Sequence, residues 1–125
     1  MLSIAVWRDS VSNGDDCAAP HELSLVLEAD ATVRDLADRF LNTRYLPLIS
    51  GDRATWILEG RQSLAVFAQQ WSQPRFLVSP STQLTMVIDL AAQPHLNFVY
   101  WCQVAPERVF ECLQLGEALP NKFGG

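Results

Sequence analysis

The last residues of the chain are the ones whose types and order suggest chemistry. The sequence ends Asn121-Lys122-Phe123-Gly124-Gly125. A carboxylate that follows two glycines is unhindered, because glycine has no side chain and no Cβ to restrict its backbone. An enzyme could thread such a tail through a narrow channel and adenylate its end. We therefore expect Gly125 to carry the reacting carboxylate and Gly124 to give it clearance. The residues recognised along the channel would be Asn121, Lys122 and Phe123.

The basic residues are unevenly divided between the two types. The chain has nine lysine and arginine residues in total, and Lys122 is the only lysine. A genome that favours arginine codons explains this imbalance. A second explanation is that an activated acyl donor benefits from carrying few amines that could capture its own acyl group. The two explanations are compatible, and both stay open.

Composition and charge limit the classes of protein to consider. A chain of 125 residues with 49% apolar and 18% charged residues is expected to fold as one globular domain. No apolar run approaches the length of a membrane span, and no secretory signal is visible at the start. A net charge of −5 argues against binding to nucleic acid or to an anionic membrane. An odd number of cysteines at unremarkable spacing is typical of reduced thiols, which predicts a cytoplasmic protein.

No catalytic or metal-binding constellation is indicated elsewhere. Cys102 and Cys112 lie among apolar residues and are expected to be core thiols, and nothing in the sequence activates Cys17. The two histidines, His21 and His95, are expected at the surface. The sequence contains no paired CxxC motif. Three aspartates near the first loop lack the spacing of a calcium loop and are interpreted as solvated: Asp9, Asp15 and Asp16. We therefore expect no catalytic residue, no metal and no cofactor.

The hydrophobic pattern predicts several strands. They fall at residues 2–8, 22–28, 54–59, 83–90 and 96–102, with a short strand at 75–78 inside a loop. For residues 63–68, periodicity does not decide between a strand and a short helix. The first two strands suggest an opening hairpin.

Two helices are predicted between and after these strands. Thr32 and Asp35 form a capping box for a helix over residues 32–41, which carries one apolar stripe. A second helix over residues 106–115 begins with Pro106 and stops at Gly116. Beyond it, proline and the loss of periodicity predict an extended tail. We thus expect one α+β domain over residues 1–116 and a tail over residues 117–125.

This order of elements resembles that of ubiquitin-like, β-grasp proteins. Leu25-Val26-Leu27-Glu28, leading into residues 31–36, is similar to the second strand, acidic bend and Thr-capped helix of that family. Residues 56–62 resemble its third strand and following turn, and residues 84–88 its last strand. The Gly-Gly ending completes the likeness. The resemblance implies a mixed sheet of about five strands around the first helix. Residues 91–123 would add a strand and a helix.

The family implies a function that its partners perform. A divergent, bacterial ubiquitin-like modifier would be activated at its C-terminal carboxylate by an E1-like enzyme and passed to an E2-like enzyme. It would then be transferred to a target protein, and a JAB-type isopeptidase would remove it. The modifier would itself be a substrate and signal, not a catalyst.

Three other functions stay open from the sequence. A β-grasp interaction module, acting as an adaptor or inhibitor, would bind partners through a sheet face or through Trp71 and would never be conjugated. Trp71 lies in a predicted loop, either exposed for such binding or packed back on the sheet. A sulfur carrier would use the same tail as a thiocarboxylate. An enzyme with an unrecognised pocket is the remaining alternative.

Overall fold

The chain has an α+β fold built on one mixed sheet. The computed structural model describes residues 1–9, 22–43, 45–46, 53–88 and 95–121. The strands in these residues are β1 (Leu2–Arg8), β2 (Glu22–Leu27), β3 (Thr55–Glu59), β4 (Ser63–Ala68), β5 (Arg75–Phe76) and β6 (His95–Tyr100). The helices are α1 (Val33–Thr43) and α2 (Pro106–Leu115), and η1 (Leu84–Met86) is a short 3-10 helix.

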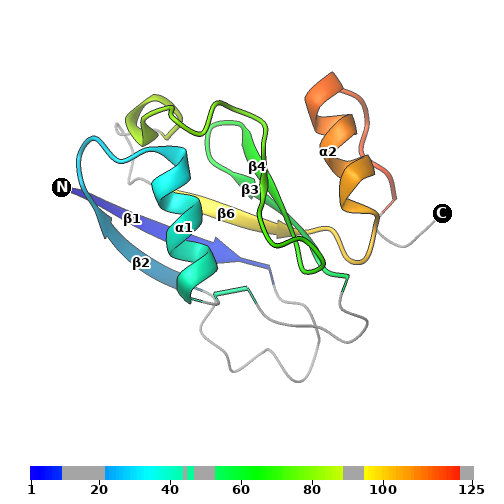
Figure 1. The fold of residues 1–125 in the computed structure, drawn as a ribbon, viewed down its shortest axis with the longest axis horizontal. Helices are drawn as coiled ribbons and strands as arrows, with labels where there is room; N and C mark the ends of the chain where they lie inside the picture. Colours follow the sequence, from blue (N-terminus) through cyan, green and yellow to red (C-terminus); the bar gives the residue numbers. More distant parts are fainter. Residues whose placement is uncertain (10–21, 44, 47–52, 89–94, 122–125) are drawn as a thin grey trace.

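The first and last strands lie side by side within the sheet. The strand order is β2-β1-β6-β3-β4-β5 (Figure 1). β1 and β6 are parallel, with Ala5 opposite His95 and Arg8 opposite Phe98. Every other neighbouring pair in this sheet is antiparallel. An antiparallel β1–β2 pair therefore extends one side of the central pair, and the β3–β4 pair extends the other.

A different helix packs against each face of the sheet. Successive side chains of a strand point to opposite faces. In β1, Ile4 and Val6 are buried whereas Trp7 is exposed. The face that carries Ile4 and Val6 packs against α1, while α2 lies over β3 and β4 on the other face. Figure 1 shows α1 lying across β1 and β2, with α2 at the opposite end of the sheet.

The capping box predicted for the first helix is confirmed. The Thr32 hydroxyl accepts a hydrogen bond from the Asp35 amide at 3.2 Å, and an Asp35 carboxylate oxygen accepts one from the Thr32 amide at 2.9 Å. The next two amides of α1 donate to carbonyls of Thr82 and Pro80. The start of α1 is thus held by hydrogen bonds from its own capping residues and by hydrogen bonds to a loop far away in the sequence.

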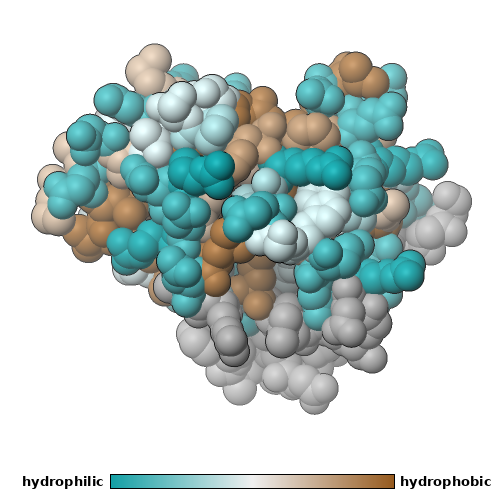
Figure 2. All heavy atoms as spheres, in the orientation of Figure 1, coloured by the Kyte–Doolittle hydropathy of each residue, from teal (hydrophilic) through white to brown (hydrophobic). Residues whose placement is uncertain are grey.

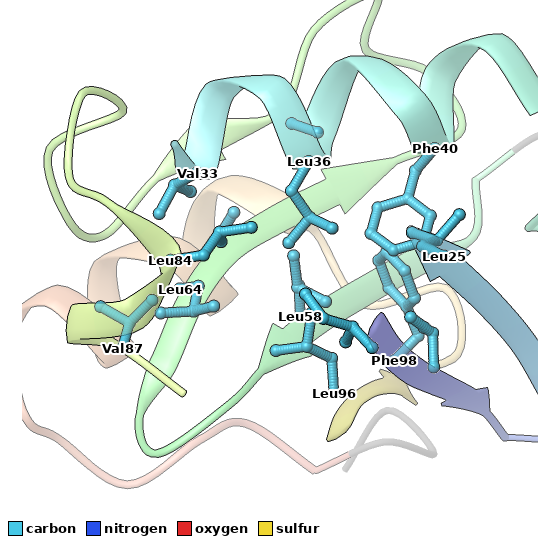
Figure 3. Close-up of a cluster of buried hydrophobic side chains, with 14 of the residues drawn as sticks. Leu25, Val33, Leu36, Phe40, Leu58, Leu64, Leu84, Val87, Leu96 and Phe98 are labelled. Carbon is cyan, nitrogen blue, oxygen red and sulfur yellow. The ribbon is translucent and has the colours of Figure 1, made fainter. Parts of the chain in front are cut away.

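The main core lies between α1 and the sheet. Figure 3 shows side chains from α1, β2, β3, β4, β6 and the η1 region pointing into one cluster. Phe98 of β6 lies at its centre, with ring centroids 4.7 Å from Phe40 and 5.2 Å from Phe67 in edge-to-face geometry. The predicted apolar stripe of α1 supplies Val33, Leu36, Ala37 and Phe40, all buried, while Leu41 is 37% exposed.

The strand predicted at residues 83–90 is wrong. Residues 84–86 form η1 instead, and among residues 83–88, the part of this segment that the structure describes, only Gln83 makes a β-bridge, to Thr32. The buried side chains here are Leu84, Val87 and Ile88. These positions are i, i+3 and i+4, the spacing of one helical turn. The apolar run that suggested a strand therefore buries its side chains by a helical turn.

The strand predicted at residues 96–102 exists as β6, but it is not an extra strand beyond the core of the fold. It lies between β1 and β3, so it takes the central place that the earlier segment was expected to fill. The described residues contain six strands, not about five, and residues 63–68 form the strand β4. The short strand predicted at 75–78 is confirmed as β5, two residues long.

Candidate functional site

The connection from β6 to α2 is tied to the first residue of β3. The Thr55 carbonyl accepts a hydrogen bond from the Trp101 amide at 2.8 Å, and the Thr55 amide donates to the Cys102 carbonyl at 2.9 Å. The Thr55 hydroxyl, fully buried, donates to the Val104 carbonyl at 2.7 Å. Cys102 has a φ of 55°, in the left-handed region that non-glycine residues seldom adopt. These bonds turn the chain out of the sheet and into α2.

α2 ends as predicted. Pro106 occupies its first turn, and Gly116 follows it with a φ of 71°. The Gly116 amide donates to the Leu113 carbonyl at 3.4 Å, and the Glu117 amide donates to the Cys112 carbonyl at 2.8 Å. This pair of bonds is the Schellman motif, which satisfies the last carbonyls of a helix and reverses the chain.

After this reversal the chain runs back along α2. Figure 1 shows the orange-red segment returning from the end of α2 toward its beginning. Leu119, half-buried, packs against the apolar cluster of Ile57, Val66 and Val109. The Trp101 indole Nε1 then donates a hydrogen bond of 2.8 Å to the Pro120 carbonyl. The segment therefore meets the protein again at the end of β6.

The predicted reactive tail lies partly outside the described residues. Asn121 is described and its side chain is exposed. The residues expected to carry the chemistry, Lys122, Phe123, Gly124 and Gly125, lie outside the described residues. The predicted tail of residues 117–125 is thus described up to Asn121, and this part contains no helix or strand.

Trp71 is half-buried between β5 and α2. Its indole Nε1 donates to a Glu107 carboxylate oxygen at 3.3 Å, and the Arg75 guanidinium lies 4.4 Å from the ring centroid. The ring also packs against the cluster of Ile57 and Val66. Of the two alternatives left open for Trp71, the structure favours packing against the body of the protein, with part of the ring still accessible.

Exposed apolar side chains lie on β1 and β2, and the sequence did not indicate which strands would carry an exposed sheet face. Trp7 is 46% exposed and Val26 is 53% exposed. They share the sheet face that carries α2, with small residues Ala5 and Ser24 paired between them. The alternation of β1, in which Ile4 and Val6 take the opposite face, was the signal that could have identified Trp7 as exposed.

The opposite side of the molecule has a different character. Figure 2, seen from the side of α1, shows a mostly hydrophilic surface, with apolar surface between α1 and α2 and at the end of α2. Leu115, the last residue of α2, is 60% exposed. Within the described residues, the exposed large apolar side chains are therefore spread over several elements: Met1, Trp7, Val26, Leu41, Met86 and Leu115.

Tyr45 provides the clearest electrostatic perturbation among the described residues. Burial raises the pKa of Tyr45 to about 12, with a further increase from Glu22 that is opposed by Arg8. Its hydroxyl donates to the Val6 carbonyl at 3.2 Å, and the Arg8 guanidinium lies 5.9 Å from its ring centroid. The phenol is thus held neutral beside the end of β1, where it packs against the core.

The cysteines and histidines form no cluster in the described residues. Cys112 is buried as predicted, whereas Cys102 is only half-buried and lies after β6, so its prediction as a core thiol is wrong. His95 begins β6 and is exposed, as predicted. No three metal-binding side chains come together in the part of the chain that the structure describes. Predictions for Cys17, His21, Asp15 and Asp16 lie outside the described residues.

Two further findings complete the description of the chain. In its described part, neither helix combines the length and apolarity that a membrane-spanning helix requires. No protein-family model matches the chain, and no curated protein or solved structure is significantly similar to it.

Proposed function

We propose that this chain is a ubiquitin-like protein modifier with a β-grasp fold, activated at a C-terminal Gly-Gly carboxylate and transferred to a target protein. One observation carries the proposal: the parallel β1–β6 pair is flanked by two antiparallel pairs, with α1 across one face. This order of four central strands and one helix is what a β-grasp fold requires. The sequence adds a tail whose last two residues are glycine.

The identity of the last strand strengthens the proposal. The sequence pattern predicts that strand at residues 83–90, which would leave a long segment before Gly-Gly. Because β6 is the strand beside β1, the segment between sheet and tail shortens to one helix and its connections. That segment also folds back to the end of β6, where Trp101 contacts Pro120. A tail leaving from there starts beside the central strand.

In the proposed mechanism, the partner enzymes perform the chemistry. An E1-like enzyme joins the Gly125 carboxylate to AMP from ATP and releases pyrophosphate. An enzyme cysteine then displaces AMP to form a thioester, and an amine of the target displaces the thiol, with an E2-like enzyme as the usual carrier. The chain contributes an unhindered backbone at Gly124 and a recognition segment at Asn121, Lys122 and Phe123. A JAB-type isopeptidase would reverse the final bond.

Intact-protein mass spectrometry of the chain from its native host tests this function. We expect a free form ending at Gly125 and a second population joined through Gly125 to another protein. The linked peptide would identify the target. A chain that stays unlinked in every growth and stress condition would contradict the proposal. A terminal carboxylate in which one oxygen is replaced by sulfur would indicate a sulfur carrier.

Two tail variants make the test specific to the proposed chemistry. Gly124→Ala places a Cβ where clearance is required, and one added residue after Gly125 displaces the carboxylate. Both are expected to abolish conjugation and to leave the melting temperature unchanged. Ala118→Ser, in the exposed part of the returning segment, is the matched control and should conjugate normally.

A second candidate function is supported by a different surface. The exposed Trp7 and Val26 lie on one sheet face beside small residues, an arrangement that suits a protein-interaction module. In that case blocking the C-terminal carboxylate would leave binding intact, whereas Trp7→Ala would weaken it. The tail variants and Trp7→Ala therefore separate the two functions.

A further inference from the structure

The segment that follows β6 leaves the sheet and returns to the end of the same strand. Trp101 lies directly after β6, and Pro120 lies after α2 and its reversal. The hydrogen bond of 2.8 Å from the Trp101 indole to the Pro120 carbonyl joins these two points. Residues 102–119 therefore form a closed unit that leaves the sheet and returns to the same place.

Several contacts hold this closed unit against the sheet. Val109 of α2 is fully buried with Ile57 of β3 and Val66 of β4. Leu119 and Trp101 are half-buried members of the same apolar cluster. The Leu119 side chain and the Pro120 carbonyl thus engage neighbouring parts of one surface, by packing and by a directional hydrogen bond. Asn121, one residue later, is exposed.

We propose that Trp101 is the positioning residue for the reactive tail. It fixes the point from which the tail leaves the fold, at Pro120 beside the end of β6. Without this contact the tail would depart from the end of α2, at Gly116. This inference rests on the proposed modifier function, because it explains how a chain with an added helix presents its carboxylate beside the central strand.

The first test measures the release of the tail in the absence of any partner enzyme. Trp101→Phe keeps an aromatic ring in the cluster and removes the indole donor together with part of the ring. Amide {1H}-15N NOE values should be high at Leu119 in the wild type and should fall from Glu117 onward in the variant. Cleavage after Glu117 by a glutamate-specific endopeptidase should become about five-fold faster, the factor for losing one ordinary hydrogen bond.

A control and a second variant separate tail release from damage to the cluster. Trp71→Phe also removes an indole from this cluster, but its hydrogen bond goes to Glu107, so the tail should stay ordered. Leu119→Ser removes the packing contact and leaves Trp101 intact, and it should release the tail as Trp101→Phe does. Tail NOE values that are the same in wild type, Trp101→Phe and Leu119→Ser would overturn the proposal.

The second test connects the released tail to conjugation. In a lysate of the native host supplied with ATP, thioester formation by Trp101→Phe and Leu119→Ser should fall about five-fold, in parallel with their tail NOE values and not with their melting temperatures. A released tail with normal thioester formation would overturn the positioning role. If the wild type forms no thioester while Trp101→Phe still releases the tail, the proposed function fails and the contact itself stands.

Discussion

The Thr55 hydroxyl lies 2.7 Å from the Val104 carbonyl and donates a hydrogen bond to it. Thr55 begins β3 and is fully buried, and Val104 lies in the turn that leads to α2. One side chain therefore joins the sheet to the C-terminal helix. Its backbone adds two more bonds, to Trp101 and Cys102. The position of α2, and of everything that follows it, depends on this residue.

Thr55→Val is expected to destabilise the protein by about 1–3 kcal/mol, because the substitution leaves the Val104 carbonyl without its donor in a partly buried place. Urea denaturation followed by fluorescence measures the change. Thr85→Val, half-buried in η1, is the matched control outside this junction. Equal stabilities for Thr55→Val and the wild type would contradict the prediction.

Phe98→Ala is expected to cost about 3–5 kcal/mol of unfolding free energy, because a large cavity would open among the rings around it. Phe98 is fully buried and faces Phe40, Tyr45, Trp56 and Phe67. Guanidinium denaturation gives the loss. Leu41→Ala, at a residue that is 37% exposed, should cost far less, and a similar loss in both variants would show that Phe98 has no special place in the core.

Gly60→Ala should destabilise the fold by crowding, by about 1–3 kcal/mol. An added Cβ would lie 2.9 Å from the Val87 carbonyl oxygen and 3.1 Å from a Leu96 methyl carbon. The Val87 carbonyl also accepts the Arg61 amide, so it cannot move without losing that bond. Thermal unfolding measures the effect.

Gly116→Ala separates crowding from backbone strain. Its Cβ would meet no atom within 4 Å, but the φ of 71° is unfavourable for alanine. We expect a cost of about 1–2 kcal/mol from the backbone alone. Because α2 packs over the sheet, the loss should appear in the same unfolding transition as that of Gly60→Ala. A neutral Gly116→Ala would mean that the reversal after α2 contributes little to stability.

The tyrosines should ionise at a higher pH in the folded protein than in the unfolded chain. Burial raises the pKa of Tyr45 to about 12 and also raises that of Tyr100. An unfolded tyrosine ionises near pH 10, so the unfolded chain loses protons first. The stability from neutral Tyr45 is complete below pH 10 and is lost as the pH rises toward 12.

Ultraviolet titration of tyrosinate checks this prediction. The folded wild type should titrate above pH 10, and the urea-unfolded chain near pH 10. Tyr45→Phe leaves Tyr100 as the only tyrosine. It should remove the part of the tyrosinate signal that appears at the highest pH. Folded and unfolded titrations that coincide would contradict the burial of both phenols.

Local signals in the sequence predicted the elements that local chemistry determines. The Thr32–Asp35 capping box and the Gly116 stop each act within a few residues, and both are confirmed. The Pro106 start of α2 belongs to the same class. These features could be predicted because the groups that satisfy each helix end lie next to it in the chain.

Tertiary contacts determine the elements for which the prediction from sequence is wrong or undecided. The pattern of residues 84–88 predicts a strand, but their amides find other partners. The Leu84 amide donates to the Ala31 carbonyl, just before α1, and the following amides donate within the turn to the carbonyls of Gln83 and Leu84. The central place of β6 depends on pairing with β1, far away in the sequence. The Trp101–Pro120 contact likewise needs the whole of α2 between its partners. No local pattern encodes such pairings.

The pairing of β1 with β6 also governs the order in which the chain can acquire its structure. Residues 5–8 find their parallel partners only at residues 95–98, so this contact spans most of the chain. Such a high contact order predicts slow folding, because the entropy of closing a long loop is lost before the contact forms. On the ribosome, the β1–β2 hairpin and α1 emerge long before β6. Until β6 has been synthesised, one edge of β1 lacks its β6 partner, and an unpaired strand edge is a site at which a nascent chain can aggregate.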